Sequence, residues 1–322
     1  MDAMPEQMIV GVDLGGSKIN TILADPEGNI KARDLRDTCA DDGPEAVIKR
    51  IVESIKQVVA GADIGGIGIG AAGVCQASNG IITFSPNLPG WHNIPLRDIV
   101  QREFGLPTCM ENDATVAALG EHCFGAGVGI DNLIYVTVGT GIGGGIIIGG
   151  QLYCGASGTA GEIGHMAINV SGPRCNCGNI GCWETFASGT ALAREAIKRI
   201  EAGAQTNILS FADGDLEKVD GEAVFMAAQE GDCLAMELIS VTGYYLGVGL
   251  VNLVNIFNPQ LILIGGGLSQ MGSLLLNPAL KVVGERAFRL PAEAVRIELA
   301  SLGTDAGALG AVALVLHDKL RR

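Results

Sequence analysis

The sequence predicts an α/β protein, and three observations carry this prediction. Apolar, β-branched runs typical of buried strands alternate along the chain with segments of helical periodicity. Glycine makes up 48 of the 322 residues, about twice its usual share of ~7%. These glycines gather in short bursts beside the β-branched runs, where tight strand turns or phosphate-binding loops occur. The length, with 48% hydrophobic residues, predicts two domains or lobes, since single cores rarely grow beyond about 250 to 300 residues.

Charge and hydropathy exclude several classes of protein. A net charge of −14, with only 17% charged residues, argues against nucleic acid as a partner, which would require a basic face. No apolar run reaches the ~18 to 20 residues of a membrane span, and the longest, residues 244–257, is broken by Gly and Asn and predicts a buried helix. The N-terminus shows no secretory signal. Nine cysteines, an odd count without a framework spacing, indicate a reducing cytoplasm.

The first half of the chain begins with an expected hairpin. Residues 7–30 contain two apolar strands joined by "DLGGSK" and followed by a "DPEGN" turn. Residues 44–62 have apolar positions at helical spacing with a polar opposite face. The other elements expected in this half are a buried strand running into a glycine-rich turn at 64–76, a helix at 95–105, a strand at 107–113 and a helix of small residues at 114–127.

The second half repeats this plan. It opens with a strand, a glycine-rich turn and a strand over 132–158, and then becomes helical. The expected elements are helices at 187–203 and within 220–257, a buried strand at 259–269 and a closing helix at 306–320. The two halves therefore share a structural plan without sharing sequence. An ordinary Rossmann-like protein is the alternative that this pattern leaves open.

Three glycine-rich loops at strand ends predict contacts with a nucleotide. "DLGGSK" (13–18) and "GTGIGGG" (139–145) place adjacent backbone N–H groups at turns with little side-chain bulk, which suits phosphate oxygens. "GGG" (265–267) follows the apolar strand "LILI", where an adenine or ribose could lie against bare backbone. The Walker pattern is absent, and "GTGIGGG" leads into a strand where the dinucleotide fingerprint requires a helix. A dehydrogenase is therefore disfavoured.

Two aspartates follow expected strands. Asp13 lies beside the first glycine loop, where it could hold Mg²⁺, usually through water. Asp113 ends "CMEND", where it could accept the proton of an attacking hydroxyl, as phosphoryl transfer to an alcohol requires. The alternative for Asp113 is structural, because it also precedes the helix "ATVAALGE" and could cap it.

The stretch "GEIGHMAINVSGPRCNCGNIGCWE" (161–184) predicts a metal site. Closely spaced thiolates with one imidazole are the ligand set of tetrahedral zinc, and the four candidates are His165, Cys175, Cys177 and Cys182. Four protein ligands leave no open position, so this zinc would be structural. It would hold the loop so that Glu162 and Glu184 bind vicinal sugar hydroxyls, since each carboxylate can accept several hydrogen bonds.

Together these motifs resemble the ROK family of bacterial repressors and sugar kinases. The similarity extends over residues 8–317 and is carried by "GVDLGGSK", "SPNLPGW", "ENDA", "ALGE", "VTVGTGIGGG", "GEIGH", "CNCGNIGCWE" and "LILIGGG". Within the family the chain is most similar to zinc-containing, ATP-dependent glucokinases. The resemblance implies an actin-like ATPase (ribonuclease-H-like) fold with two lobes. We expect a small lobe of residues 1–113 completed by 304–322, and a large lobe of 114–303 that carries the zinc loop.

The resemblance also implies roles for individual residues. Asp113 would be the general base for the sugar 6-hydroxyl. The hexose would be held by Asn87, Asn112, Asp113, Glu162, His165 and Glu184. ATP would contact Asp13, Gly15, Gly16, Ser17, Lys18, Gly139, Thr140, Gly141, Gly143, Gly265, Gly266 and Gly267. The expected cofactors are ATP with Mg²⁺ and a structural Zn²⁺.

The expected activity is phosphorylation of glucose at its 6-hydroxyl, as in glycolysis, by a cytoplasmic homodimer. Fructose, mannose, N-acetylmannosamine and N-acetylglucosamine are the alternative substrates. A sugar sensor without catalysis is the alternative from another class. Family repressors carry an N-terminal helix-turn-helix of several dozen residues. Because only seven residues precede the first expected strand, we expect no DNA-binding domain.

Overall fold

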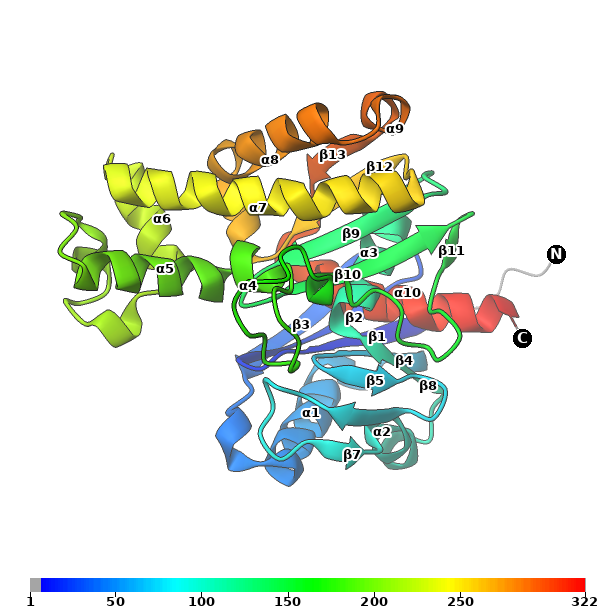
Figure 1. Ribbon diagram of the computed structural model, residues 1–322. Coiled ribbons are helices and arrows are strands. Elements are labelled where there is room, and N and C mark those ends of the chain that lie inside the picture. The colour runs from blue at the N-terminus through cyan, green and yellow to red at the C-terminus, as the bar shows by residue number, and fades with distance from the viewer. Residues whose placement is uncertain (1–6, 322) are drawn as a thin grey trace. The chain divides into compact units, whose positions relative to one another are not determined.

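The computed structural model describes residues 7–321, and these form two compact units by their internal contacts (Figure 1). The described residues of the first unit fall in Met1–Tyr135, Gly145–Gly161 and Ala300–Arg322. Those of the second fall in Val136–Gly144 and Glu162–Leu299. Residues 1–6 and 322 of the predicted small lobe lie outside the described part. The first unit extends past the predicted boundary at 113, because the helix that begins there packs within it.

The first unit contains a five-stranded sheet in the order β3-β2-β1-β4-β8. Strand β2 is antiparallel to β1 and β3, whereas β4 is parallel to β1 and β8. The strands are β1 Met8–Leu14, β2 Lys18–Ala24, β3 Ile30–Asp37, β4 Ile64–Ala71 and β8 Thr108–Asn112. A smaller sheet in the order β5-β6-β7 consists of Val74–Gln76, Ile81–Phe84 and His92–Ile94.

Helices cover both faces of the five-stranded sheet. The side chains of β1 alternate, so Val10 and Val12 join the core shared with α1 and α2, whereas Ile9 joins the core shared with α10. Helix α10 also packs along α3, which places α3 in the first unit. The helices are α1 Pro44–Val59, α2 Leu96–Phe104, α3 Asp113–Phe124 and α10 Ala306–Arg321.

Glycines in β4 allow α10 and α3 to lie directly on the sheet. Three glycines, Gly66, Gly68 and Gly70, occupy every second position of the strand, so all three lie on the same face of the sheet. A Cβ at Gly68 would overlap the backbone of Ala311 in α10, and one at Gly70 would overlap the side chain of Val116 in α3. Much of the glycine excess near β4 therefore serves close packing and not a turn.

We expect Gly68→Ala to lower the free energy of unfolding by about 1–3 kcal/mol or more, because the new methyl group cannot be accommodated without moving α10. Gly284→Ala is the matched control. Gly284 lies in a helix with nothing within 4 Å of an added Cβ, so the same change should be neutral or stabilise by up to about 1 kcal/mol. Urea denaturation of both variants measures the difference. Equal stabilities would show that the β4 glycines are not packing sites.

A second five-stranded sheet has the order β11-β10-β9-β12-β13. Counted along the chain, this is the order of the first sheet, which agrees with the predicted duplication of structure. The strands are β9 Leu133–Val138, β10 Ile142–Ile148, β11 Gln151–Leu152, β12 Leu261–Gly265 and β13 Arg296–Leu299. The helices of the second unit are α4 Glu184–Ala187, α5 Gly189–Glu201, α6 Gly221–Gln229, α7 Cys233–Phe257, α8 Ser273–Arg286 and α9 Arg289–Ala294.

Helix α7 is long and apolar enough to cross a membrane by length and composition alone. The prediction of a buried helix at 244–257 is confirmed, although the helix begins earlier than expected, at Cys233. Of the most apolar 18-residue stretch of α7, 61% is buried, and the helix packs against α8, as core helices do. The feature is therefore weak evidence for a membrane span.

Candidate active site

In the first unit, Asn112 and not Asp113 caps helix α3. The Asn112 Oδ1 accepts a hydrogen bond from the Thr115 backbone N–H at 3.2 Å, and its Nδ2 donates to the Gly73 carbonyl at 3.1 Å. The Asp113 Oδ1 accepts from the N–H of the next residue, Ala114, at 2.8 Å. The interpretation of Asp113 as the cap of α3 is therefore wrong, and its carboxylate lies directly after β8, on the first residue of the helix.

Asp13 and Asp113 lie close enough to influence each other. Burial, together with a smaller effect of the nearby Asp113 carboxylate, raises the pKa of Asp13 from 3.8 to about 7. The Asp13 carboxyl also lies against Gly307, in the first turn of α10, where a Cβ would overlap it. Two neighbouring carboxyl groups, one of them buried, form a site that a cation would stabilise. Oxygen ligands of this kind suit Mg²⁺.

The first glycine loop is a tight turn that touches the loop containing Asn87. The Gly15 N–H donates to the Lys18 carbonyl at 2.9 Å, which closes the turn. A Cβ on Gly16 would lie 2.9 Å from both the Cβ and the carbonyl oxygen of Asn87, so only glycine fits here. The structure thus brings two of the predicted segments together. The ammonium group of Lys18, by contrast, pairs with Asp37 of β3 on an exposed surface.

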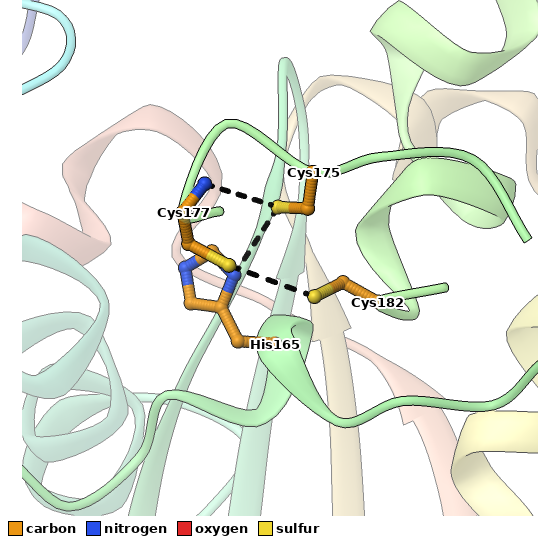
Figure 2. Close-up of side chains that lie close together, drawn as sticks. All are labelled: His165, Cys175, Cys177 and Cys182. Carbon is orange, nitrogen blue, oxygen red and sulfur yellow. Dashed lines mark hydrogen bonds between the residues drawn. The ribbon is translucent and has the colours of Figure 1, made fainter. Parts of the chain in front are cut away.

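In the second unit, the four predicted metal ligands converge (Figure 2). Their ligand atoms all lie within 4.8 Å of one another. The Cys177 and Cys182 Sγ atoms are 3.7 Å apart, and the Cys175 Sγ is 3.6 Å from the His165 Nδ1. A tetrahedral zinc with Zn–S bonds of about 2.3 Å would hold its sulfur ligands about 3.8 Å apart. The donor set and its spacing therefore fit zinc.

Two carboxylates flank this metal cluster, as predicted. The Glu184 Oε1 accepts from the Cys175 thiol at 2.9 Å and lies 3.5 Å from the His165 Nδ1, whereas the Glu162 Oε2 lies 3.7 Å from the His165 Nε2. The pKa of Glu162 is raised above its usual value, mainly by burial. The imidazole of His165 partly opposes this increase, and the carboxylate of Glu184 adds to it. Nδ1 therefore faces the thiols, and Nε2 faces Glu162. One imidazole can ligate a metal and orient a carboxylate at the same time.

The second glycine loop lies beside Glu184. A Cβ on Gly141 would be 2.7 Å from the Glu184 Oε2, and the Gly139 N–H closes the turn by donating to the Gly141 carbonyl at 3.0 Å. The Gly139 carbonyl accepts from the Gly189 N–H at 2.7 Å, and the Thr140 carbonyl accepts from the Thr190 hydroxyl at 2.8 Å. These bonds join the loop to the start of α5.

A cavity of about 720 Å³ lies within the second unit beside this loop, within the range of small-molecule sites. The predicted Gly139, Thr140 and Gly267 line it. Its other walls, which were not predicted from the sequence, come from the starts of α5 and α6 and from the segment after β12. These residues are Gly189, Thr190, Ala193, Val219, Asp220, Gly221, Glu222, Phe225, Leu268, Gln270 and Met271.

The sequence does contain a pattern that marks the α5 and α6 walls of this cavity. Ser188 caps α5 and Asp220 caps α6, and each is followed directly by a glycine at the first helical position. The side chain of Ser188 accepts from the Ala191 N–H at 3.2 Å, and that of Asp220 accepts from the Ala223 N–H at 2.8 Å. Helix N-termini that begin with glycine commonly present their backbone N–H groups to a bound ligand.

The paired sheets of identical order are those of the actin-like ATPase fold, the fold of a class of sugar kinases. The sequence matches the ROK family over residues 9–318, and the chain belongs to this family. The predictions of the fold and of the family are confirmed.

Three relatives illustrate the similarity. A glucokinase of Thermotoga maritima is 38% identical over 315 residues, which cover 97% of this chain and 98% of that protein. A xylose repressor of Caldicellulosiruptor bescii is 37% identical over 317 residues, covering 97% of this chain and 79% of the repressor. A crystal structure of a ROK family glucokinase from Streptomyces griseus, in complex with glucose and AMPPNP, superimposes with a TM-score of 0.86. It is 37% identical, and the match covers 96% of this chain and 99% of that one.

Proposed function

We propose that this protein is an ATP-dependent glucose kinase that transfers the γ-phosphoryl group to the sugar 6-hydroxyl. The observation that carries the proposal lies directly after β8, where Asn112 and not Asp113 caps α3, and where the Asp113 carboxylate lies close to the buried carboxyl group of Asp13. Relatives named glucokinase and the bound ligands of the Streptomyces griseus enzyme support the choice of glucose and ATP.

Asp113 would accept the proton of the 6-hydroxyl as that oxygen attacks the γ-phosphorus. The bond between the γ-phosphorus and the bridging oxygen then breaks, and ADP leaves with the bonding electron pair. A positioned base of this kind contributes roughly 10²- to 10⁴-fold to the rate.

Asp13 would hold Mg²⁺, whose chemistry is to neutralise the charge of the phosphate oxygens. The backbone of the first loop, Gly15 to Lys18, and that of the second, Gly139 to Gly143, would contact those oxygens. The adenosine would occupy the 720 Å³ cavity, which Gly267 lines, with Gly265 and Gly266 directly before it in the chain. We expect the backbone of Lys18 to take part, since its ammonium group is paired with Asp37.

Glu162, His165 and Glu184 would bind sugar hydroxyls in the second unit, and Asn87 and Asn112 would do so in the first. A structural zinc on His165 Nδ1 and the three thiols would fix the loop that carries both glutamates. Each carboxylate can accept two hydrogen bonds from vicinal hydroxyls, which suits a hexose.

A panel of sugars tests the proposal. We expect a coupled assay of ADP release to give the highest kcat/KM with glucose, and lower values with fructose, mannose, N-acetylmannosamine and N-acetylglucosamine. A higher kcat/KM with another hexose would show that the protein is a kinase of that sugar and not of glucose. The similarity to a xylose repressor favours a second candidate, a sugar sensor. Tight sugar binding without ATP turnover on any hexose would establish the sensor and overturn the kinase.

We also infer a cytoplasmic homodimer. The support for the compartment is that none of the nine cysteines, all of which the structure describes, forms a disulfide. The homodimer is inferred from the resemblance to the enzymes of the family. Sedimentation velocity at micromolar concentration tests the oligomeric state.

A further inference from the structure

The first unit contains a cavity of about 330 Å³ that none of the proposed chemistry uses. It is lined by Glu111 of β8, Leu119 of α3, Leu152 of β11 and Leu314 of α10, and the Glu111 carboxyl group lies beside the thiol of another lining residue, Cys154. All of these residues belong to one unit. The cavity therefore combines a carboxyl group with an apolar lining, and its volume suits a small molecule.

Glu111 is under-satisfied for a buried carboxyl group. Glu111 is buried, with only 4% of its surface exposed. The Oε1 atom accepts from the Asn112 backbone N–H at 2.9 Å, and the Oε2 atom accepts only weakly from the Cys154 thiol at 3.9 Å. A carboxylate can accept about four hydrogen bonds. Burial accordingly raises the pKa of Glu111 from 4.5 to about 7, and the two donors only partly oppose this.

The arginine at the edge of the cavity does not neutralise Glu111. The Arg97 guanidinium donates to the backbone carbonyls of Ser78 at 3.0 Å and Asn79 at 3.1 Å, and its Nε donates to the Asp98 carboxylate at 3.0 Å. It is thus occupied in holding the loop after β5. The remaining polar groups of the lining include His317 and a second carboxyl group, Asp318. Because the Glu111 carboxyl group accepts only two hydrogen bonds and Arg97 is paired elsewhere, Glu111 favours a ligand that donates hydrogen bonds and carries positive charge.

We propose that this cavity is a binding site for a small organic cation, a primary amine on a short apolar body. The ammonium group would donate to the Glu111 carboxylate, and the apolar body would lie against Leu119, Leu152 and Leu314. This proposal is independent of the kinase activity, because it rests on one unit and on residues outside the candidate active site.

Calorimetric titration of the full chain with benzylamine, compared with benzyl alcohol, tests the proposal. The two probes have the same shape and differ in charge at neutral pH. We expect benzylamine to bind with a dissociation constant below about 1 mM and at least tenfold more tightly than benzyl alcohol. Glu111→Gln should weaken benzylamine at least tenfold. Glu103→Gln is the matched control, since Glu103 is an exposed carboxylate of α2 paired with Lys56, and it should leave binding unchanged.

A second variant guards against a folding defect in Glu111→Gln. Leu152→Trp keeps the carboxyl group and fills the cavity from a partly exposed wall position, so it should also abolish benzylamine binding. Circular dichroism of each variant establishes that it is folded. Undetectable binding of benzylamine, equal affinity for the two probes, or full affinity in a folded Glu111→Gln or Leu152→Trp protein would each overturn the proposal.

Discussion

Asp113→Asn should reduce kcat by roughly 10²- to 10⁴-fold and leave the KM for glucose nearly unchanged. The amide has the shape of the carboxylate and can keep the hydrogen bond from the Ala114 N–H, which Asp113 accepts at 2.8 Å. It cannot accept the proton of the 6-hydroxyl. The effect should therefore fall on the chemical step, and a coupled assay over a range of glucose concentrations measures it.

Asp113→Ala separates catalysis from helix capping. If Asp113 capped α3, this variant would lose about 1 kcal/mol of stability. Because Asn112 is the cap, we expect Asp113→Ala to unfold at nearly the wild-type urea concentration while it loses activity like Asp113→Asn. An Asp113→Asn protein that keeps more than a third of wild-type turnover would contradict the role of Asp113 as the base.

Interactions between nearby residues in the chain could be predicted from the sequence. The metal ligands span only residues 165 to 182, so their spacing limits the ways in which they can meet, and all four converge as expected. The same holds for Glu162 and Glu184, which lie at the two ends of this segment. The order of strands and helices was also largely predictable, because buried strands and amphipathic helices differ in the period of their apolar residues.

Interactions between distant residues could not be predicted in this way. The glycines of β4 looked like a turn signal, but they serve the approach of α10, some 240 residues later in the chain. Strand β3 was missed because it lies at the edge of the sheet, where none of its residues is fully buried and charged residues stand on both faces, which weakens the apolar signal. Helices α8 and α9 and strand β13 were also missed.

Sequence position could not decide the role of Asp113, since Asn and Asp are equally good caps and stand side by side. Only the hydrogen bond from the Thr115 N–H to Asn112 distinguishes them. The walls of the nucleotide cavity were missed for a different reason. They come from the starts of α5 and α6 and from the segment after β12, which lie far apart in the sequence and share no motif that marks a common site.

Cys177→Ser should lose both the zinc and most of the activity, although the residue is proposed to hold metal and not sugar. Cys177 is an exposed member of the cluster, and its Sγ lies 3.7 Å from that of Cys182. The backbone N–H of Asn179 lowers the pKa of the Cys177 thiol, which favours the thiolate that zinc requires. A serine hydroxyl is a poor zinc ligand, so three ligands would remain.

The loss of zinc should act on the sugar through Glu184 and His165. Without the metal, only weaker contacts with Cys175 and Glu184 would hold the His165 Nδ1, and the carboxylates of Glu162 and Glu184 would lose their common orientation. Misplacement by about 1 Å can reduce a rate on the order of 10²-fold. The KM for glucose should therefore rise. The KM for ATP should change little, because the proposed adenosine cavity is lined by α5, α6 and the segment after β12.

Metal analysis by plasma emission, with kinetics on the same samples, measures both effects. Cys233→Ser is the matched control, because Cys233 is an exposed cysteine at the start of α7 and the chemical change is identical. That variant should keep one zinc per chain and wild-type kinetics, so a loss seen only in Cys177→Ser is specific to the cluster. Wild-type protein without zinc would contradict the metal assignment. A zinc-free Cys177→Ser protein with a normal KM for glucose would keep the metal site but show that zinc does not organise the sugar-binding carboxylates.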